Sequence, residues 1–140
     1  CRIVEVYGAT ETGIVTYTPL EEEPAKGSCG RANTSSYHVA IVDDEDNIQP
    51  AGVVGEIVVR PAQPFSMIQE YYNMPTETLA AFRNLWFHTG DNGRLDGDGF
   101  FYYIEFRESL PKTPNQKVQK YLLRKGVDKG PVFDREARDG

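Results

Sequence analysis

The chain has 140 residues, enough for one ordinary hydrophobic core, and its 15 basic and 21 acidic side chains give a formal net charge of −6. This balance argues against a nucleic-acid-binding surface and against a polybasic membrane patch. No apolar run is long enough to cross a bilayer, and two cysteines without metal-ligand spacing are too few for a disulfide framework. We therefore expect a cytoplasmic protein with no nucleic-acid partner and no transmembrane segment.

The first residues predict a strand. Residues 3–7 are rich in β-branched side chains and alternate in polarity, which predicts a short strand ended by Gly8. The sequence opens inside this strand and has no initiator methionine. We expect the chain to be a piece of a larger protein.

Turn-forming residues divide the following part of the chain into short segments. Residues 19–30 are rich in Pro, Gly and Glu, which predicts a solvated loop. Residues 37–42 and 55–60 are predicted strands, and an acidic turn at residues 43–47 leads from the first into a partner segment around Ile48. Strands separated by such turns are typical of a small β-barrel or sandwich.

The second half combines short helices with a β-hairpin. Residues 76–82 predict a helix with Pro75 in its first turn. Residues 85–103 return to strand, and the Asp-Gly pairs at residues 96–99 supply the positive φ angles of a tight turn. Residues 117–125 have helical character. The predicted fold class is mainly β with short helices, an α+β fragment.

The first candidate site is Tyr-Gly-Ala-Thr-Glu-Thr-Gly at residues 7–13. The ring of Tyr7 can stack on a base, the hydroxyl of Thr10 can meet a phosphate, and the carboxylate of Glu11 can hold Mg²⁺. Gly8 lets the backbone turn beside such a ligand. The alternative is a strand end followed by a helix cap, which the same residue types also form.

The second candidate is Thr-Gly-Asp at residues 89–91, directly after an aromatic segment. A carboxylate at a strand end can accept hydrogen bonds from both hydroxyls of a ribose, as in dinucleotide-binding folds. We expect Asp91 at the mouth of a sheet, where it is a candidate ribose ligand. The alternative is a simple turn with an aspartate cap.

The third candidate is the loop at residues 110–117. Two prolines and an asparagine predict a stiff, extended segment that presents Lys117 away from the body of the protein. Lysine is a compact charge that suits a phosphate or a developing anion. The alternative is an exposed polar loop.

Other patterns support no site. The acidic runs at residues 43–47 and 96–99 lack the spacing of a calcium loop, so hairpin tips are expected there. His38 falls within a predicted strand and His88 beside aromatic residues, and no Gly-x-Ser-x-Gly motif supports a catalytic triad. No glycine-rich phosphate loop is present.

Together and in this order, the three motifs resemble the adenylate-forming superfamily of acyl-CoA synthetases, firefly luciferase and peptide-synthetase adenylation domains. Residues 26–31 resemble its Gly-x-x-Gly-x-Pro segment, and residues 55–60 resemble its Gly-Glu-Ile strand. Residues 71–78 resemble its Tyr-x-Asn-x-Pro-x-x-Thr segment. The resemblance covers roughly residues 4–125 and is greatest to bacterial carnitine/crotonobetaine or medium- to long-chain acyl-CoA ligases.

The resemblance implies an acid–thiol ligase that converts a carboxylic acid, fatty or short acyl, to acyl-AMP with ATP and transfers the acyl group to CoA. The implied cofactors are ATP or AMP, Mg²⁺ and CoA, the implied partner is the acid substrate, and a homo-oligomer is a possible assembly. By position, the resemblance assigns adenine stacking to Tyr7, the α-phosphate to Thr10, Mg²⁺ to Glu11, the ribose to Asp91 and charge neutralisation during adenylation to Lys117. Gly8 is expected as a further cofactor-binding residue.

The resemblance breaks near residues 102–104, because the segment that follows belongs just before the family's catalytic-lysine loop. Gln116 also stands where glycine usually precedes that lysine. A real deletion and a numbering laid over unobserved segments both explain the break. The predicted organisation is the barrel-like end of the large domain at residues 1–103, a remnant of the small domain at 104–126 and a tail at 127–140.

The phosphate loop, most of the large domain and the family's hinge have no counterpart in these residues. We therefore expect the chain alone to be inactive, although its parent is an enzyme. Two alternatives remain open: a non-catalytic β module that acts through partners, and a peptide-synthetase adenylation domain.

Overall fold

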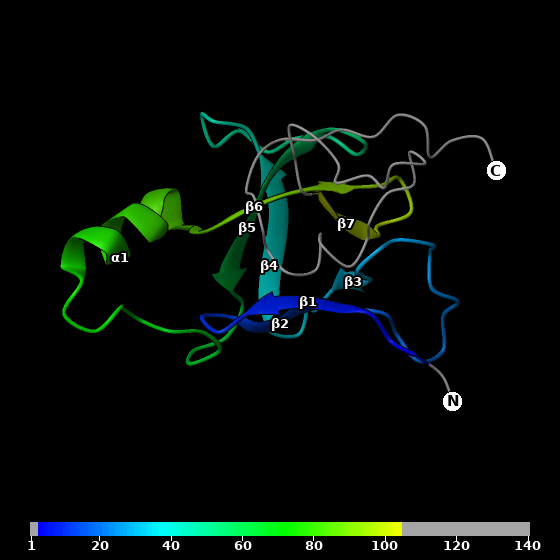
Figure 1. The fold of residues 1–140 in the computed structure, drawn as a ribbon, viewed down its shortest axis with the longest axis horizontal. Helices are drawn as coiled ribbons and strands as arrows, with labels where there is room; N and C mark the ends of the chain where they lie inside the picture. Colours follow the sequence, from blue (N-terminus) through cyan, green and yellow to red (C-terminus); the bar gives the residue numbers. More distant parts are fainter. Residues whose placement is uncertain (1–2, 105–140) are drawn as a thin grey trace, which may run out of the picture. The chain divides into compact units, whose positions relative to one another are not determined.

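The computed structural model describes residues 3–104, which form two antiparallel sheets and one short α-helix (Figure 1). The chain divides into two units, Cys1–Ile104 and Glu105–Gly140, and the described residues belong to the first. One sheet has the strand order β1-β2-β3 and the other has the order β4-β5-β6-β7. The elements are β1 (Val6–Ala9), β2 (Gly13–Tyr17), β3 (Arg31–Ala32), β4 (Tyr37–Val42), β5 (Val54–Pro61), α1 (Pro75–Ala81), the 3₁₀ turn η1 (Arg83–Leu85), β6 (Phe87–Leu95) and β7 (Phe101–Ile104). The predicted fold class, mainly β with short helices, is confirmed.

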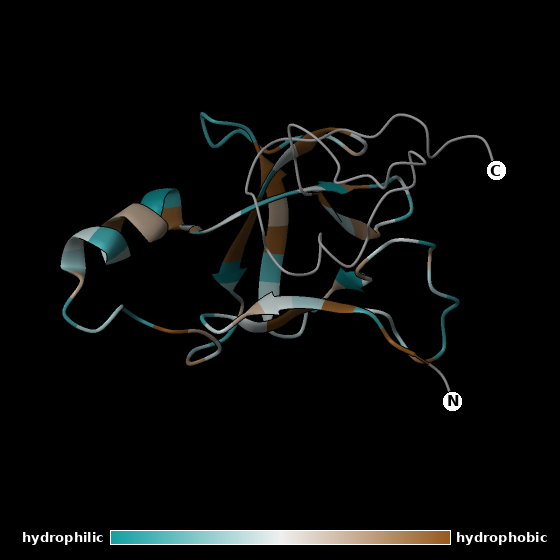
Figure 2. Ribbon diagram, viewed as in Figure 1, coloured by the Kyte–Doolittle hydropathy of each residue, from teal (hydrophilic) through white to brown (hydrophobic). Residues whose placement is uncertain are grey.

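Strand β5 forms the centre of the four-stranded sheet, with β4 on one side and β6 on the other. The side chains of Ile57, Val58 and Val59 are fully buried. A strand that is covered on both faces carries a continuous apolar run in place of alternating polarity. Figure 2 shows apolar residues concentrated along β4 and β5. The core of this unit is therefore built on the middle strand.

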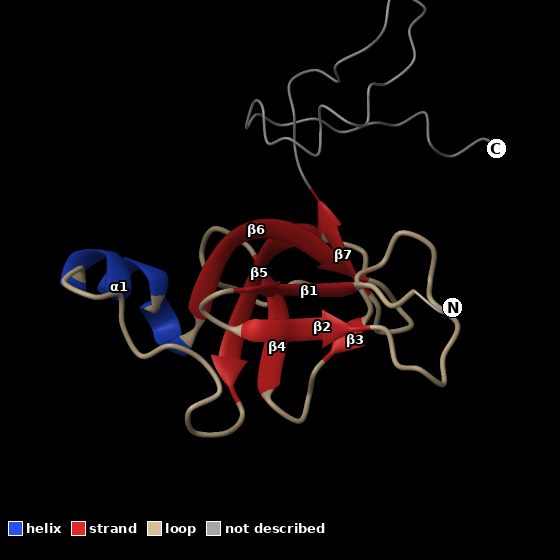
Figure 3. Cartoon of the chain, turned by 60° about the horizontal axis from the view of Figure 1, so that its bottom comes forward, coloured by secondary structure: helices blue, strands red, loops and turns tan. Residues whose placement is uncertain are grey.

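The two sheets pack against each other through two clusters of buried side chains. One cluster consists of Val15, Tyr37 and Val59. The other consists of Cys29, Ile41, Ile57 and Phe101, and Tyr7 of β1 and Ala32 of β3 pack against it. Figure 3 shows β1 and β2 lying across the curved four-stranded sheet. Each large apolar side chain buried in this way contributes about 1.5–3 kcal/mol, so the clusters hold the sheets together.

Strand β1 differs from the prediction at both ends. It runs from Val6 to Ala9 and not over residues 3–7, so Gly8 lies inside the strand and does not end it. The pairing with β2 shifts register between Tyr7 and Gly8. A Cβ atom on Gly8 would lie 1.9 Å from the carbonyl oxygen of Gly13. The glycine is required because two backbones approach closely at this irregular point.

The predicted loop at residues 19–30 has no regular structure, but its last residues are buried. The N–H of Cys29 donates to the carbonyl of Phe101 at 2.8 Å, and the N–H of Phe101 donates to the carbonyl of Gly30 at 2.8 Å. These bonds supply partners to backbone groups of β7 that would otherwise be buried and unpaired. The expectation of a fully solvated loop is wrong here, because local composition does not reveal pairing with a strand about 70 residues away.

The acidic turn at residues 43–47 is a hairpin tip, as the sequence predicts. The carboxylate of Asp43 accepts the N–H of Glu45 at 3.0 Å and the N–H of Asn47 at 2.9 Å. The hydrogen bond from the Asn47 backbone has the largest effect on the pKa of the Asp43 carboxyl and lowers it below its usual value, and the bond from the Glu45 backbone acts in the same direction. The turn is thus held by its own first side chain.

The predicted helix is present as α1, with Pro75 in its first turn. Phe82, just after the helix, packs its ring against Phe87 of β6 with the centroids 5.1 Å apart. Leu79 of α1 is 76% exposed. No helix within residues 3–104 combines the length and apolar character needed to cross a membrane.

We predict that Gly8→Ala lowers the free energy of unfolding by about 1–3 kcal/mol or more, because the added methyl group collides with the Gly13 carbonyl. Gly97→Ala is the matched control, since a Cβ atom there meets nothing within 4 Å. Its stability should stay within about 0.5 kcal/mol of the wild type. Urea unfolding followed by the fluorescence of Trp86 measures both variants, and equal stabilities would contradict the close approach.

Candidate functional site

The structure brings the first and second predicted motifs into contact. Tyr7 of β1 donates its hydroxyl hydrogen to the Oδ2 atom of Asp91 in β6 at 2.9 Å, although the residues are 84 positions apart. The ring of Tyr7 also stacks on Tyr103 of β7, with centroids 6.1 Å apart and planes inclined by 25°. Three strands from two sheets therefore meet at one aromatic ring and one carboxylate.

The environment of Tyr7 is partly buried and negatively charged. Burial is the largest influence on its pKa and raises it well above the usual value, and the hydrogen bond to Asp91 and the charge of that carboxylate raise it further. A nearby Thr89 hydroxyl acts in the opposite direction. The phenol consequently stays protonated and acts as a hydrogen-bond donor to Asp91.

Asp91 lies within strand β6, where the strand bulges. Val58 pairs with His88 and Glu56 pairs with Asn92, so residues 89–91 stand opposite a single residue of β5. The sequence predicted a carboxylate at a strand end, and this is wrong because the strand continues beyond the bulge to Leu95. Bulges of this kind redirect a side chain without ending the sheet.

Side chains satisfy the backbone groups that the bulge removes from the ladder. Gly90 has φ of +74°, a conformation that glycine adopts without strain. Its N–H donates to the Oε1 atom of Glu56 at 2.9 Å. The hydroxyl of Thr89 donates to the carbonyl of Ile57 at 2.7 Å and accepts the N–H of Asp91 at 3.1 Å. The Thr-Gly-Asp sequence is thus a self-bonded bulge that projects Asp91.

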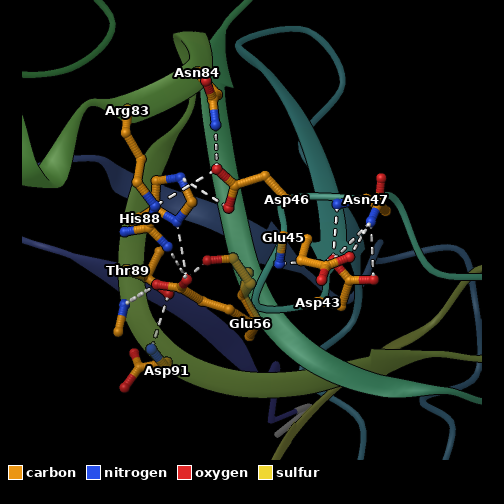
Figure 4. Close-up of polar contacts among 12 residues, drawn as sticks. Asp43, Glu45, Asp46, Asn47, Glu56, Arg83, Asn84, His88, Thr89 and Asp91 are labelled. Atoms are coloured by element: carbon orange, nitrogen blue, oxygen red, sulfur yellow. Dashed lines mark hydrogen bonds and ion pairs between the residues drawn. The ribbon is translucent and has the colours of Figure 1, made fainter.

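A cluster of ionisable side chains lies next to the bulge, and we call it the Glu56 cluster (Figure 4). It consists of Asp46, Glu56, Arg83 and His88. The Oε2 atom of Glu56 lies 2.8 Å from Nδ1 of His88 and 3.3 Å from Nη2 of Arg83. Asp46 lies 3.5 Å from Nε of Arg83 and 3.7 Å from Nε2 of His88.

Sequence reasoning missed the Glu56 cluster. It placed His88 only beside aromatic residues and treated the acidic turn containing Asp46 as a hairpin tip. The cluster depends on the register of β5 against β6, which brings Glu56 to a residue 32 positions away. A glutamate beside the apolar run of the predicted strand at residues 55–60 was an available signal, since a partly buried carboxylate needs partners.

Glu11 is held by hydrogen bonds from the segment that contains Ile68 and Tyr71. Tyr71 donates its hydroxyl hydrogen to the Oε1 atom of Glu11 at 3.1 Å. The N–H of Ile68 donates to the Glu11 carbonyl at 2.9 Å. Burial first, and then this carboxylate, raise the pKa of Tyr71. Among the described residues no hydrogen bond reaches the other carboxylate oxygen of Glu11.

Thr10 is exposed in the turn between β1 and β2. Thr12 stabilises this turn, because its hydroxyl oxygen accepts the N–H of Ala9 at 3.2 Å. Strand β2 begins at Gly13, so the alternative that these residues cap a helix is wrong. Lys117 and its loop lie outside the described residues.

Within residues 3–104, no group of three or more His, Cys, Asp or Glu side chains comes together in a way that could hold a metal ion. Magnesium, however, is commonly held by one or two carboxylates together with the phosphates of a substrate. The single carboxylate of Glu11, with the exposed hydroxyl of Thr10 beside it in the chain, fits that second kind of site.

Comparison with known proteins gives three consistent similarities. Residues 1–72 match the family model of AMP-binding enzymes. The chain is 36% identical over 105 residues to the acyl-coenzyme A synthetase ACSM4, mitochondrial, of Homo sapiens, covering 74% of this chain and 18% of that protein. It is 35% identical over 122 residues to the crotonobetaine/carnitine–CoA ligase of Salmonella paratyphi C, covering 84% and 23%.

A solved structure, that of ATP-bound MatB from Rhodopseudomonas palustris, superposes with a TM-score of 0.67 at 29% identity. The superposition covers 72% of this chain and 20% of that one. The chain thus spans about a fifth of the length of the relatives that it matches.

We predict that the stability of the protein falls as the pH rises above 10, and that Tyr7→Phe makes this fall shallower. The pKa of Tyr7 is raised in the folded state, so its stabilising effect is present below the usual tyrosine value near 10 and is lost as the pH rises toward the folded-state pKa. Urea unfolding between pH 8 and pH 11.5 measures the slope. Tyr72→Phe, at a side chain that is 88% exposed, is the control. Identical slopes in Tyr7→Phe and the wild type would contradict this environment for Tyr7.

Proposed function

This chain belongs to the family of AMP-binding enzymes, and from that premise we propose that it forms the nucleotide-binding part of an acid–thiol ligase. The match confirms the resemblance to adenylate-forming acyl-CoA synthetases that the motifs indicate. The proposed reaction has two steps. A carboxylate oxygen attacks the α-phosphorus of ATP and releases pyrophosphate, and the thiol of CoA then attacks the acyl carbon and releases AMP.

The observation that carries the proposal is the contact between Tyr7 and Asp91. A base and its ribose are neighbouring parts of one nucleotide, so a site for both needs an aromatic surface beside a hydrogen-bond acceptor. The Tyr7 ring and the Asp91 carboxylate meet this requirement, although they come from motifs 84 positions apart. The MatB structure similar to this chain is described as ATP-bound, which supports the same ligand.

We assign the ribose hydroxyls to Asp91. A carboxylate offers about four lone-pair sites on its two oxygens. The Tyr7 hydroxyl occupies one site on Oδ2 at 2.9 Å, and the remaining sites can accept both ribose hydroxyls. Because Tyr7 is held by Asp91 and by stacking on Tyr103, its ring is positioned before a nucleotide arrives, beside the backbone of Gly8.

We assign the phosphate side to the turn between β1 and β2. The exposed hydroxyl of Thr10 suits the α-phosphate, and Glu11, oriented by Tyr71, suits Mg²⁺. Bound there, Mg²⁺ would neutralise phosphate charge. Lys117 is the proposed group that stabilises the charge developing on the α-phosphate during adenylation. These roles follow the chemistry of phosphoryl transfer, in which positioning and charge stabilisation dominate.

The proposed substrate is a carboxylic acid and the proposed acceptor is CoA. One relative is named as an acyl-coenzyme A synthetase and another as a crotonobetaine/carnitine–CoA ligase, so a fatty or short acyl group is the proposed class. The cytoplasm is the proposed location, in keeping with a buried, unpaired Cys29.

The experiment that tests the function has two parts. The intact mass of the protein isolated from its source is measured, and ATP–pyrophosphate exchange is then followed with a panel of carboxylic acids. A mass near 15.7 kDa without exchange would mean that the assigned residues are inherited from an active ancestor and catalyse no reaction in this chain. A larger mass with acid-dependent exchange supports the ligase. Nucleotide binding without exchange would favour a non-catalytic binding module.

We predict that Asp91→Asn and Lys117→Ala separate binding from chemistry. Asp91→Asn should weaken AMP binding by about 10- to 100-fold, because hydrogen bonds to a charged acceptor are worth about 1.5–3 kcal/mol. Lys117→Ala should leave AMP affinity within a few-fold and lower exchange by about 100-fold or more. Calorimetry measures the first effect and isotope exchange measures the second.

Asp44→Asn is the matched control, because it neutralises an exposed carboxylate in the acidic turn. Its AMP affinity and its exchange rate should equal those of the wild type. Equal loss of affinity in Asp44→Asn and Asp91→Asn would show that net charge, and not a ribose contact, controls binding.

A further inference from the structure

We propose that Glu56 is a positioning residue for the nucleotide site, and that it acts through the backbone N–H of Gly90 on the neighbouring Asp91. The inference rests on the proposed function, because it concerns the same ribose-binding carboxylate. It adds a residue that touches no nucleotide and a cluster that holds it in place.

Both carboxylate oxygens of Glu56 are engaged. The Oε1 atom accepts the N–H of Gly90 at 2.9 Å. The Oε2 atom lies 2.8 Å from Nδ1 of His88 and 3.3 Å from Nη2 of Arg83. The side chain is 22% exposed and is thus mostly enclosed by these donors. Since both oxygens are engaged inside the protein, Glu56 is suited to holding its neighbours and not to binding a ligand.

The bond to Gly90 sits at the point where the bulge would otherwise be loose. Gly90 has φ of +74°, and its N–H donates to the side chain of Glu56 and not to a backbone carbonyl of β5. Glycine has the greatest backbone freedom of any residue, so its conformation needs an outside constraint. A hydrogen bond from an N–H to a carboxylate is charge-assisted and stronger than a neutral one. The peptide that Glu56 fixes leads directly into Asp91.

The two ends of the bulge are held by different groups. Thr89 bonds both the Ile57 carbonyl and the Asp91 N–H, which fixes the first and last residues. Without Glu56, the middle residue would have no partner for its N–H among the groups that hold the other two. Displacement of a binding group by about 1 Å can cost about 100-fold in activity. Loss of this single hydrogen bond would therefore displace the carboxylate of Asp91.

The rest of the Glu56 cluster keeps the carboxylate in position. The side chain of His88 is 3% exposed and lies between Glu56 and Asp46. Arg83 reaches both carboxylates, at 3.3 Å from Glu56 and 3.5 Å from Asp46. Asp46 also accepts a hydrogen bond from the side-chain amide of Asn84. A buried carboxylate is tolerated only with such partners, and they limit the positions that its oxygens can take.

The test compares Glu56→Ala and Glu56→Gln in the full chain with the control Glu77→Ala, which removes an exposed carboxylate from α1. Three quantities are measured: the AMP dissociation constant, the chemical shift of the Gly90 amide proton, and the unfolding midpoint. We expect Glu56→Ala to weaken AMP binding by about 10- to 100-fold. Its Gly90 amide proton should move upfield, because the charge-assisted bond is lost.

Glu56→Gln keeps the shape and one acceptor oxygen, and it decides the question if the alanine variant does not fold. We expect a several-fold loss of affinity and a smaller upfield shift, because the uncharged amide accepts more weakly and presents a donor toward His88 in place of an acceptor. Glu77→Ala should match the wild type in all three quantities. If Glu56 only stabilised the fold, both variants would lower the unfolding midpoint, but the Gly90 amide proton would have the same chemical shift in Glu56→Ala and in Glu56→Gln.

The inference is overturned if both Glu56 variants fold and bind AMP as tightly as the control, or if the Gly90 signal is the same in all three variants. Failure of the proposed function gives a different result, since the wild type and every variant would then bind no AMP. In that case the Gly90 signal alone decides whether Glu56 positions the bulge: a shift in Glu56→Gln supports it, and an unchanged signal refutes it.

Discussion

The candidate site depends on one strand that carries more residues than its partner. Residues 89–91 of β6 face a single residue of β5, so their backbone groups cannot all join the ladder. The N–H groups of Gly90 and Asp91 have side-chain acceptors instead, which Glu56 and Thr89 provide. These two side chains stabilise the bulge. The bulge directs Asp91 toward Tyr7, whereas in a regular strand the side chains would continue to alternate between the two faces of the sheet.

The contact between Tyr7 and Asp91 joins the two sheets at the site. The clusters that pack β2 against β4 and β5 hold the sheets in a constant relation, and this relation sets the distance across the site. The close approach at Gly8 also belongs to this arrangement, because it brings β1 against the start of β2, directly after the turn that carries Thr10 and Glu11. The geometry of the site therefore depends on the packing of the core.

Much of the fold could be predicted from local sequence. The strand at Tyr37–Val42 and the helix beginning at Pro75 occur where the residue pattern places them, because β-branched runs, proline and Asp-Gly pairs act over a few residues. The end of the loop at residues 19–30 could not be predicted, because its burial depends on pairing with Phe101. The types of residue at the site, an aromatic ring, a hydroxyl and carboxylates, were also evident from the motifs.

The sequence by itself determined the family, the mainly β fold and the candidates Tyr7, Thr10, Glu11 and Asp91. Only the tertiary structure decided that Tyr7 touches Asp91, that Tyr71 orients Glu11, and that Asp91 lies in a bulge within a strand. It alone revealed the cluster around Glu56. The physical reason is that turns and strands arise from neighbours in the chain, whereas sheet register brings together groups 32 to 84 positions apart.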